Sequence, residues 1–178
     1  MGRRKYVKDY NLKHSVDEKG RLSSKPEYVG AYFVFRESME TVRAQARKSL
    51  IACGAAWAAF AASLFLNTGS MRLFHVSLPY AFTAIPLWLL TEVSLKALRV
   101  QGKLQHRESD EMNQKYPASS MWVAVLTLFA LLGMLVSVIY GAGNLVKADV
   151  AFALLASVVC ACGAYCFSRK STFTTEEL

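Results

Sequence analysis

The stretch from Met121 to Tyr140, MWVAVLTLFALLGMLVSVIY, decides the fold because it is apolar throughout and contains no charged residue. The hydrocarbon core of a bilayer is about 30 Å thick, and a helix needs roughly 20 apolar residues to cross it. This stretch has the required length and composition. It therefore predicts a transmembrane helix and indicates that the chain is an integral membrane protein.

Three further stretches have the same apolar character. They are Ser49–Leu66, Phe74–Val93 and Ala148–Phe167. Together with residues 121–140 they predict an all-α membrane protein with four transmembrane helices. The overall composition agrees, because 53% of the 178 residues are hydrophobic, which is a high share for a soluble domain of this size.

The 21 lysines and arginines are distributed unevenly around these stretches. They form three clusters, with 12 in residues 1–48, 5 in residues 96–115, and the pair Arg169 and Lys170. The other two loops contain only Arg72 and Lys147. Because loops rich in lysine and arginine stay on the cytoplasmic side, the clusters predict an N-in, C-in topology.

This topology divides the chain into three parts. They are a basic cytoplasmic N-terminal segment (1–48), a transmembrane domain (49–167) with a cytoplasmic loop (96–120), and a cytoplasmic tail (168–178). The two outer loops are short and contain no glycosylation sequon, and we expect no cleaved signal peptide. We therefore expect a multi-pass protein of the cell membrane, and the bacterial cytoplasmic membrane fits best.

The N-terminal segment is too short to bury a core of its own. Residues 17–20 (DEKG) favour a turn and are flanked by Val16 and Leu22, which predicts a small hairpin. The aromatic run from Tyr28 to Phe35 should lie at the membrane interface or pack on the cytoplasmic ends of the helices.

Small residues recur at intervals of four in the first and fourth stretches, and such strips let two helices approach closely. The candidate helix-packing residues are Gly54, Ala58 and Ala62 in the first stretch and Ala156, Cys160 and Ala164 in the fourth. We expect these strips to bring the first and fourth helices together within the chain. Contact with a second copy or with a partner subunit is the alternative.

The second stretch differs from the others because it contains Pro79 and Pro86. Proline has no backbone donor, so Pro86 predicts a kink that leaves the carbonyl of Phe82 to the nearby hydroxyl of Thr83. Interrupted membrane helices mark substrate pathways in transporters, although proline also occurs in ordinary membrane helices. The candidate pathway residues are Thr83, Pro86, Thr91 and Glu92.

Glu92 lies one turn before Lys96, a spacing that predicts an ion pair on the helix surface. The helical pattern then continues to Leu104, which predicts a cytoplasmic extension of the second helix. The bases at this level are candidates for binding anionic lipid headgroups. They are Lys96, Arg99, Lys103 and Arg107. Topology alone also produces a collar of bases, and we expect no nucleic-acid partner.

The sequence contains no recognisable catalytic or nucleotide-binding motif. His14, His75 and His106 are isolated from one another. Cys162 and Cys166 have the spacing of two metal ligands on one helix face, but no histidine or carboxylate accompanies them. We interpret the cysteines as packing residues, and we expect no enzyme activity, metal or cofactor.

Two functional hypotheses follow. The first is a non-enzymatic accessory or structural subunit that associates, through its small-residue faces, with a second copy or another membrane protein. The second is a small channel or transporter subunit that works as an oligomer, with the kinked second span lining the pathway. The lack of an ionisable group near the middle of any span counts against the second hypothesis.

Overall fold

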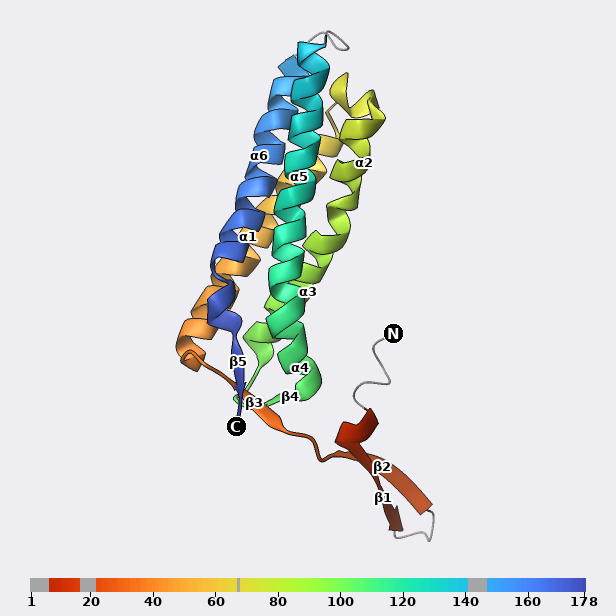
Figure 1. Cartoon of the computed structure of the whole chain (residues 1–178), viewed down its shortest axis with the longest axis vertical. Helices are drawn as coiled ribbons and strands as arrows, with labels where there is room; N and C mark the ends of the chain where they lie inside the picture. Colours follow the sequence, from red (N-terminus) through yellow and green to blue (C-terminus); the bar gives the residue numbers. More distant parts are fainter. Residues whose placement is uncertain (1–6, 17–21, 67, 141–146) are drawn as a thin grey trace.

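The computed structural model describes residues 7–16, 22–66, 68–140 and 147–178. Over these ranges the chain is mostly helical, and the helices form an elongated bundle with a small sheet at one end (Figure 1). We call this end the foot of the bundle. The foot comprises residues 32–43, 96–116 and 169–178.

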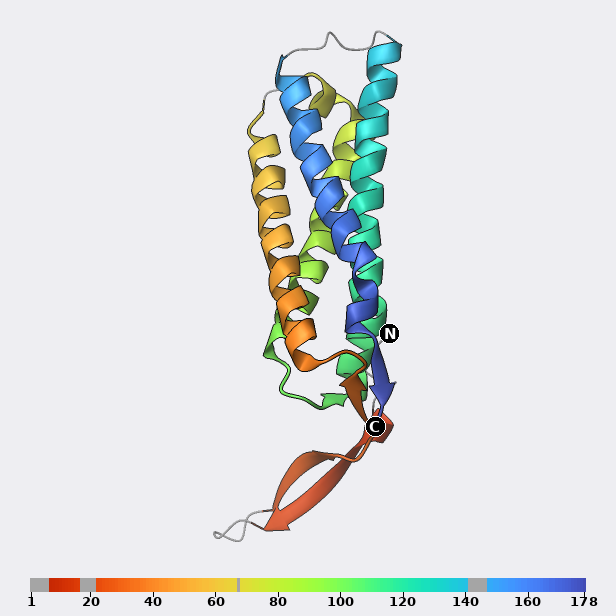
Figure 2. The same ribbon diagram turned by 90° about the vertical axis from the view of Figure 1, so that its left-hand side faces the viewer.

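The bundle has four helical columns. They are α1 (Met39–Leu64), α2 (Phe74–Phe82) followed by α3 (Ala84–Arg99), α5 (Tyr116–Ile139), and α6 (Lys147–Ser168). Two short 3₁₀ turns, η1 (Val7–Asp9) and η2 (Ser70–Arg72), precede β1 (Tyr10–Val16) and α2. The helix α1 packs against α3 and α6, and α5 packs against α2, α3 and α6 (Figure 2). The predicted contact between the first and fourth helices is therefore present.

Three helical segments in the described ranges are long and apolar enough to cross a membrane. They are Phe74–Arg99, His106–Ile139 and Lys147–Ser168. These segments agree with a helical membrane protein. The helix α1 is not among them. It ends at Leu64, and its residues after Lys48 are largely alanine, glycine and serine. A crossing by α1 and the direction of the crossings stay predictions.

The second predicted span is interrupted at Thr83, between α2 and α3. The N–H of Leu87 donates to the carbonyl of Thr83 at 3.1 Å, so regular bonding resumes directly after Pro86. The predicted interruption is confirmed. The Thr83 hydroxyl donates to the carbonyl of Pro79 at 3.1 Å rather than to that of Phe82. A threonine in a helical backbone reaches the carbonyl four residues earlier, which explains this difference.

The helix α3 extends beyond the predicted span to Arg99 but ends there. Gly102 then has a φ of 108°, a conformation that favours glycine, and the chain turns. Leu104 lies in β4 and Arg107 lies in α4, so the prediction of one helix reaching these residues was wrong. The bounds of these elements are Leu104–Gln105 for β4 and His106–Asp110 for α4.

A single π-helical turn, η3 (Glu111–Lys115), joins α4 to α5 without a break. The third helical column of the bundle therefore begins at His106 rather than at the predicted Met121. Such wide turns widen the helix by one residue and occur frequently at functional sites. Here the turn places Glu111 at the start of the long helical column.

The N-terminal residues form a hairpin that projects from the foot (Figure 1). The strands β1 (Tyr10–Val16) and β2 (Leu22–Tyr28) are antiparallel, with Val16 opposite Leu22. The predicted hairpin is confirmed. Its turn, residues 17–20, lies outside the described residues.

A second sheet at the foot departs from the predicted all-α fold. The strand β3 (Tyr32–Phe35) pairs with β4 on one side and with β5 (Thr175–Glu177) on the other. The tail passes through η4 (Lys170–Phe173) before it enters this sheet. Within the aromatic run, Phe35 is buried and Phe33 packs against the core, whereas Val29 and Tyr32 are exposed. The second of the two predicted placements therefore holds for the end of the run only.

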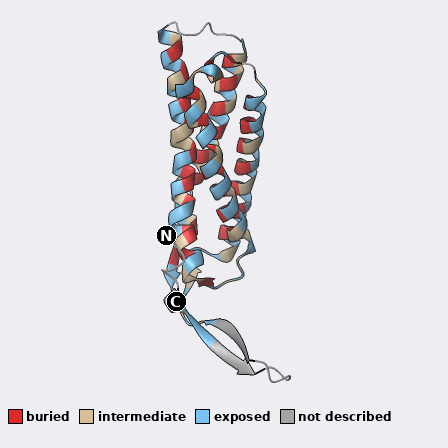
Figure 3. Ribbon diagram, turned by 90° about the vertical axis from the view of Figure 1, so that its right-hand side faces the viewer, coloured by how far each residue is buried: buried red, intermediate tan, exposed pale blue. Residues whose placement is uncertain are grey.

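Buried residues line the inside of the bundle, and exposed residues face outward (Figure 3). Tyr80 lies at the centre of an aromatic cluster, with ring centroids 5.0 Å from both Phe60 and Phe152. Its hydroxyl accepts a hydrogen bond from the hydroxyl of Ser63 at 2.8 Å. This cluster connects α1, α2 and α6, and the buried phenol has the partner it needs.

Candidate functional site

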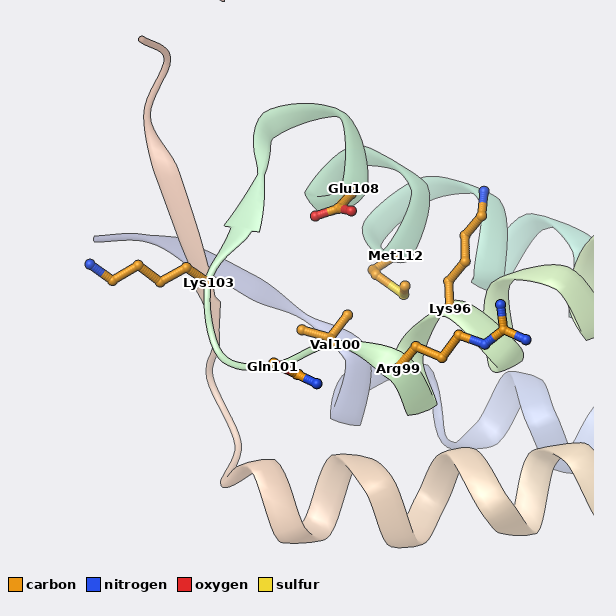
Figure 4. Close-up of a pocket in the computed structure, with 7 residues that line it drawn as sticks. All are labelled: Lys96, Arg99, Val100, Gln101, Lys103, Glu108 and Met112. Atoms are coloured by element: carbon orange, nitrogen blue, oxygen red, sulfur yellow. The ribbon is translucent and has the colours of Figure 1, made fainter. Parts of the chain in front are cut away.

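The predicted headgroup bases lie at the foot, beside a pocket between the end of α3 and the segment α4–η3. This pocket, which we call the foot pocket, has a volume of about 340 Å³. Its lining residues are Lys96, Arg99, Val100, Gln101, Lys103, Glu108 and Met112 (Figure 4). The structure thus brings three of the four predicted bases together, and Arg107 is not among the lining residues.

Lys96 is held by two carboxylates. Its Nζ lies 2.7 Å from Oε1 of Glu92 and 2.7 Å from Oε2 of Glu111, which confirms the predicted Glu92–Lys96 ion pair. The side chain of Glu111 is only 7% exposed and also lies 2.7 Å from Nζ of Lys115 and 3.7 Å from Nε of Arg107. Glu111 is therefore the shared anion of this network.

Burial alone would raise the pKa of Glu111, which lies in η3 before the apolar helix α5. The hydrogen bonds and charges of Lys115 and Lys96 outweigh burial and hold this pKa below its usual range. Glu111 is consequently ionised at neutral pH. Its ion pair with Lys96 connects η3 to α3. We call this connection the Glu111 clamp, and it holds Lys96 in place at the wall of the foot pocket.

We expect Glu111→Gln to lower the free energy of unfolding by about 1–3 kcal/mol. The lysines that bond to this side chain would then face a neutral amide instead of a carboxylate, and hydrogen bonds between two charged groups are the stronger kind. Glu92→Gln removes a carboxylate from the same lysine at an exposed position and should cost less than about 0.5 kcal/mol. Thermal unfolding of the purified chain in detergent measures both. Equal losses for the two variants would contradict the clamp.

A second polar cluster joins the hairpin to the foot. Nδ1 of His106 lies 3.2 Å from Oδ2 of Asp9, and Nε2 lies 4.0 Å from Oδ2 of Asp110. The backbone N–H of His106 donates to the hydroxyl of Tyr28 at 2.9 Å, and its ring stacks on Phe33 with centroids 5.5 Å apart. These contacts attach the base of the hairpin to the N-terminus of α4.

The small-residue strip of α1 faces away from the bundle. Gly54, Ala58 and Ala62 are all exposed, and a Cβ atom on Gly54 would meet nothing within 4 Å. This strip does not pack within the chain, which excludes the first of the two predicted placements. The helix has small residues on its inner side as well, including the buried Cys53 and Ala56. Contact of the outer strip with another chain stays a prediction.

The strip on α6 packs partly against α5 and not only against α1. Ala156 is buried, Cys160 is half-buried and Ala164 is exposed. The Cys160 thiol donates to the carbonyl of Ala124 at 3.6 Å. These two helices approach each other closely at Gly163, where a Cβ atom would lie 2.9 Å from the backbone nitrogen of Ala124. The four-residue spacing alone did not single out Gly163.

None of the candidate pathway residues lines the foot pocket, although Glu92 forms an ion pair with Lys96, which does. Thr83 and Pro86 are buried in the bundle. The Thr91 hydroxyl donates to a carbonyl one turn earlier at 2.8 Å and accepts from Nε1 of Trp57 at 3.2 Å. Glu92 is exposed on the outer surface beside Lys96. The two threonine hydroxyls are thus already used in helix packing.

The four cysteines are free thiols, and Cys53 and Cys166 are buried. Among the residues that the structure describes, no group of three or more histidine, cysteine, aspartate or glutamate side chains is placed to hold a metal ion. The candidate pair Cys162 and Cys166 therefore lacks further ligands in these ranges.

Two residues that the sequence analysis did not single out have clear structural roles. Glu111 was recognisable in principle, because Arg107 and Lys115 flank it at intervals of four, a spacing for helical ion pairs. Asp149, in the first turn of α6, is 2% exposed and accepts a hydrogen bond from the N–H of Ser70 at 3.0 Å. An acidic residue in a first helical turn is a favourable pairing with the helix dipole.

No protein-family model matches the chain, and neither a curated protein nor a solved structure matches it significantly. The functional argument therefore rests on the residues and geometry described above.

Proposed function

We propose that the chain is a non-enzymatic subunit of a membrane assembly and that the outward face of α1 binds a transmembrane helix of a partner. This outward face consists of Gly54, Ala55, Ala58, Ala61 and Ala62, all of which are exposed. Small residues allow two helix backbones to approach closely in a bilayer, where packing rather than water exclusion drives association.

The contrast between the outward faces of α1 and α5 carries this proposal. Large apolar side chains, which suit contact with lipid, cover the outward face of α5. They are Met121, Trp122, Leu128, Phe129, Leu132, Leu135, Val136 and Ile139. Within α1 the exposed large apolar residues are only Ile51 and Leu64, at the two ends of the small-residue face. A face of alanine and glycine gains little from lipid and much from a second helix.

In this proposal α1 crosses the bilayer with the other three columns, and the foot lies in the cytoplasm. The helix α1 packs against α3 and α6, which belong to segments of spanning length and composition (Figure 2). The foot contains the clustered bases, as the positive-inside rule requires of a cytoplasmic surface. The cell membrane is the expected location.

The charges on α1 favour a different protein over a second copy as the partner. Arg43, Arg47 and Lys48 are exposed at the foot end of this helix. Two copies that met through α1 in the same orientation would bring these like charges together. A partner helix with acidic residues at its cytoplasmic end would instead complement them.

Purification from native membranes in mild detergent, followed by mass measurement of the intact complex, tests the proposal. We expect a complex with another protein, and we expect Ala58→Leu to release the chain from it because the larger side chain keeps the partner helix at a distance. Ala81→Leu adds the same bulk at an exposed position of α2 and serves as the control. A complex whose mass Ala58→Leu leaves unchanged would contradict the proposed face.

The channel or transporter hypothesis receives less support. It relies on the interruption at Thr83, but the hydroxyls of Thr83 and Thr91 are bonded within their own helix. Glu92 pairs with Lys96 on the outer surface rather than lining an interior path. A pathway would require these side chains to leave their present partners, whereas the assembly hypothesis leaves them as they are.

A further inference from the structure

The foot pocket combines unpaired positive charge with an apolar wall. Lys96 is neutralised by two carboxylates, but Arg99 and Lys103 form no ion pair with any residue in the described ranges. The amine of Lys103 lies over the ring of Tyr32, 5.8 Å from its centre, and this contact holds it on the β3 side of the pocket. Two exposed cations therefore lie on the rim of one pocket.

Among the described residues, Glu108 is the one acidic residue that lines the pocket, and its carboxylate bonds to the backbone at the start of α4. The carboxylate of Glu108 accepts a hydrogen bond at 3.1 Å from the N–H of Gln105 at the start of α4. Its charge is therefore directed partly at a helix N-terminus, where it is favourable. The pocket as a whole keeps an excess of positive charge.

The inner wall is apolar. Met112 is 1% exposed, and Val100 packs beside the core (Figure 4). In Figure 4 the charged ends of Arg99 and Lys103 lie on opposite sides of the pocket, and the side chains of Val100 and Met112 lie between them. An occupant that matches this arrangement has an anionic group at the rim and a less polar part against the wall.

We propose that the foot pocket binds a phosphate group, and that an anionic phospholipid supplies it. Arg99 can hold phosphate oxygens with its planar guanidinium, and Lys103, on the opposite side of the rim, adds to the positive potential without contacting the same phosphate. The pocket lies at the cytoplasmic end of α3, at the level where headgroups meet the protein in the proposed topology. This inference uses that topology but does not depend on the partner of α1.

Native mass spectrometry of the purified full-length chain tests the site. The probes are phosphatidylglycerol and phosphatidylcholine at equal concentration in detergent micelles. We expect retention of phosphatidylglycerol, and we expect Arg99→Gln combined with Lys103→Gln to weaken it about 10-fold or more, since each base near a membrane contributes to the binding of anionic lipid. Both residues are exposed, so the melting temperature should change little.

A matched control separates a specific site from general surface charge. Arg47→Gln combined with Lys48→Gln removes two exposed bases from α1, outside the foot pocket, and should weaken binding less than about 3-fold. Gln101→Trp leaves the charge unchanged but obstructs the rim, and we expect it to weaken binding as well. Equal losses in the two double variants would overturn the pocket as the binding site.

Competition with inorganic phosphate distinguishes the source of the phosphate group. If the lipid is the occupant, an excess of inorganic phosphate should not displace phosphatidylglycerol, because the free anion lacks contact with the apolar wall. Full displacement by inorganic phosphate would overturn the lipid as the source. Equal retention of phosphatidylcholine would overturn the requirement for an anionic headgroup.

Discussion

Phe173→Ala is expected to lower the free energy of unfolding by about 3–5 kcal/mol, the usual cost of deleting a buried phenylalanine ring. The side chain of Phe173 has no exposed surface, and its ring centroid lies 4.4 Å from that of Tyr116. Truncation would leave a cavity where η4 packs on the start of α5. Thermal unfolding in detergent measures the loss.

The reason for so large an effect is that Phe173 connects the C-terminal segment to the bundle. Two residues after it, the hydroxyl of Thr175 lies in contact with the hydroxyl of Ser109 and accepts a hydrogen bond from the side-chain amide of Asn113 at 2.7 Å. The backbone N–H of Leu178 donates to the carbonyl of Tyr32 at 3.0 Å. The loss of the ring should therefore also release β5 from β3.

Leu178→Ala is the matched control, because it shortens a side chain in the same segment that is 70% exposed. Its effect should stay within about 0.5 kcal/mol. Amide hydrogen exchange of β5 gives a second measurement, and it should become faster in Phe173→Ala only. A stability loss of equal size in both variants would mean that the tail is not anchored through the phenylalanine.

The helices of this chain could be predicted because each has a long apolar run, and such runs are a local property of the sequence. The break at Thr83 was also predictable, since Pro86 removes a backbone donor in any context. The hairpin was predictable from its turn residues and the flanking Val16 and Leu22. In each case the decisive residues lie within a few positions of one another.

The second sheet and the orientation of α1 could not be predicted in this way. The pairing of β3 with β5 depends on Thr175 meeting Asn113 across the fold, and no local pattern specifies such a distant contact. The helix α1 has small residues on almost every side after Lys48, so the spacing of its apolar residues does not indicate which face is buried. Gly54 and Ala56 are both candidates by size, but only Ala56 faces inward.

The candidate site was predicted in its residue types but not in its shape. The bases Lys96, Arg99 and Lys103 were identified from their positions after the second span. The helix α3 ends at Arg99, and the positive φ of Gly102 then turns the chain toward α4, so that the three bases come to line one pocket. A continuous helix would have placed these bases along one column without a cavity.

The glycines of the bundle yield the second large prediction, because their surroundings differ sharply. Gly163→Ala is expected to lower the free energy of unfolding by about 1–3 kcal/mol, the usual cost of overpacking. A Cβ atom at this position would lie 2.9 Å from the backbone nitrogen of Ala124 and 3.1 Å from the carbonyl oxygen of Ser120. Backbone atoms cannot rotate away, so α5 and α6 must separate.

Two other glycines make this a graded series measured by thermal unfolding of the isolated chain in detergent. At Gly133 a Cβ atom would lie 3.0 Å from the carbonyl oxygen of His75, so Gly133→Ala should cost less than Gly163→Ala. Gly54→Ala meets nothing within 4 Å and should be neutral or stabilising by up to about 1 kcal/mol, since alanine is the better helix former. The expected loss of stability therefore decreases in the order Gly163, Gly133, Gly54. This order follows from helix packing, because helix propensity alone would favour alanine at all three positions. A uniform response of the three variants would therefore contradict the close approach of α5 and α6 at Gly163.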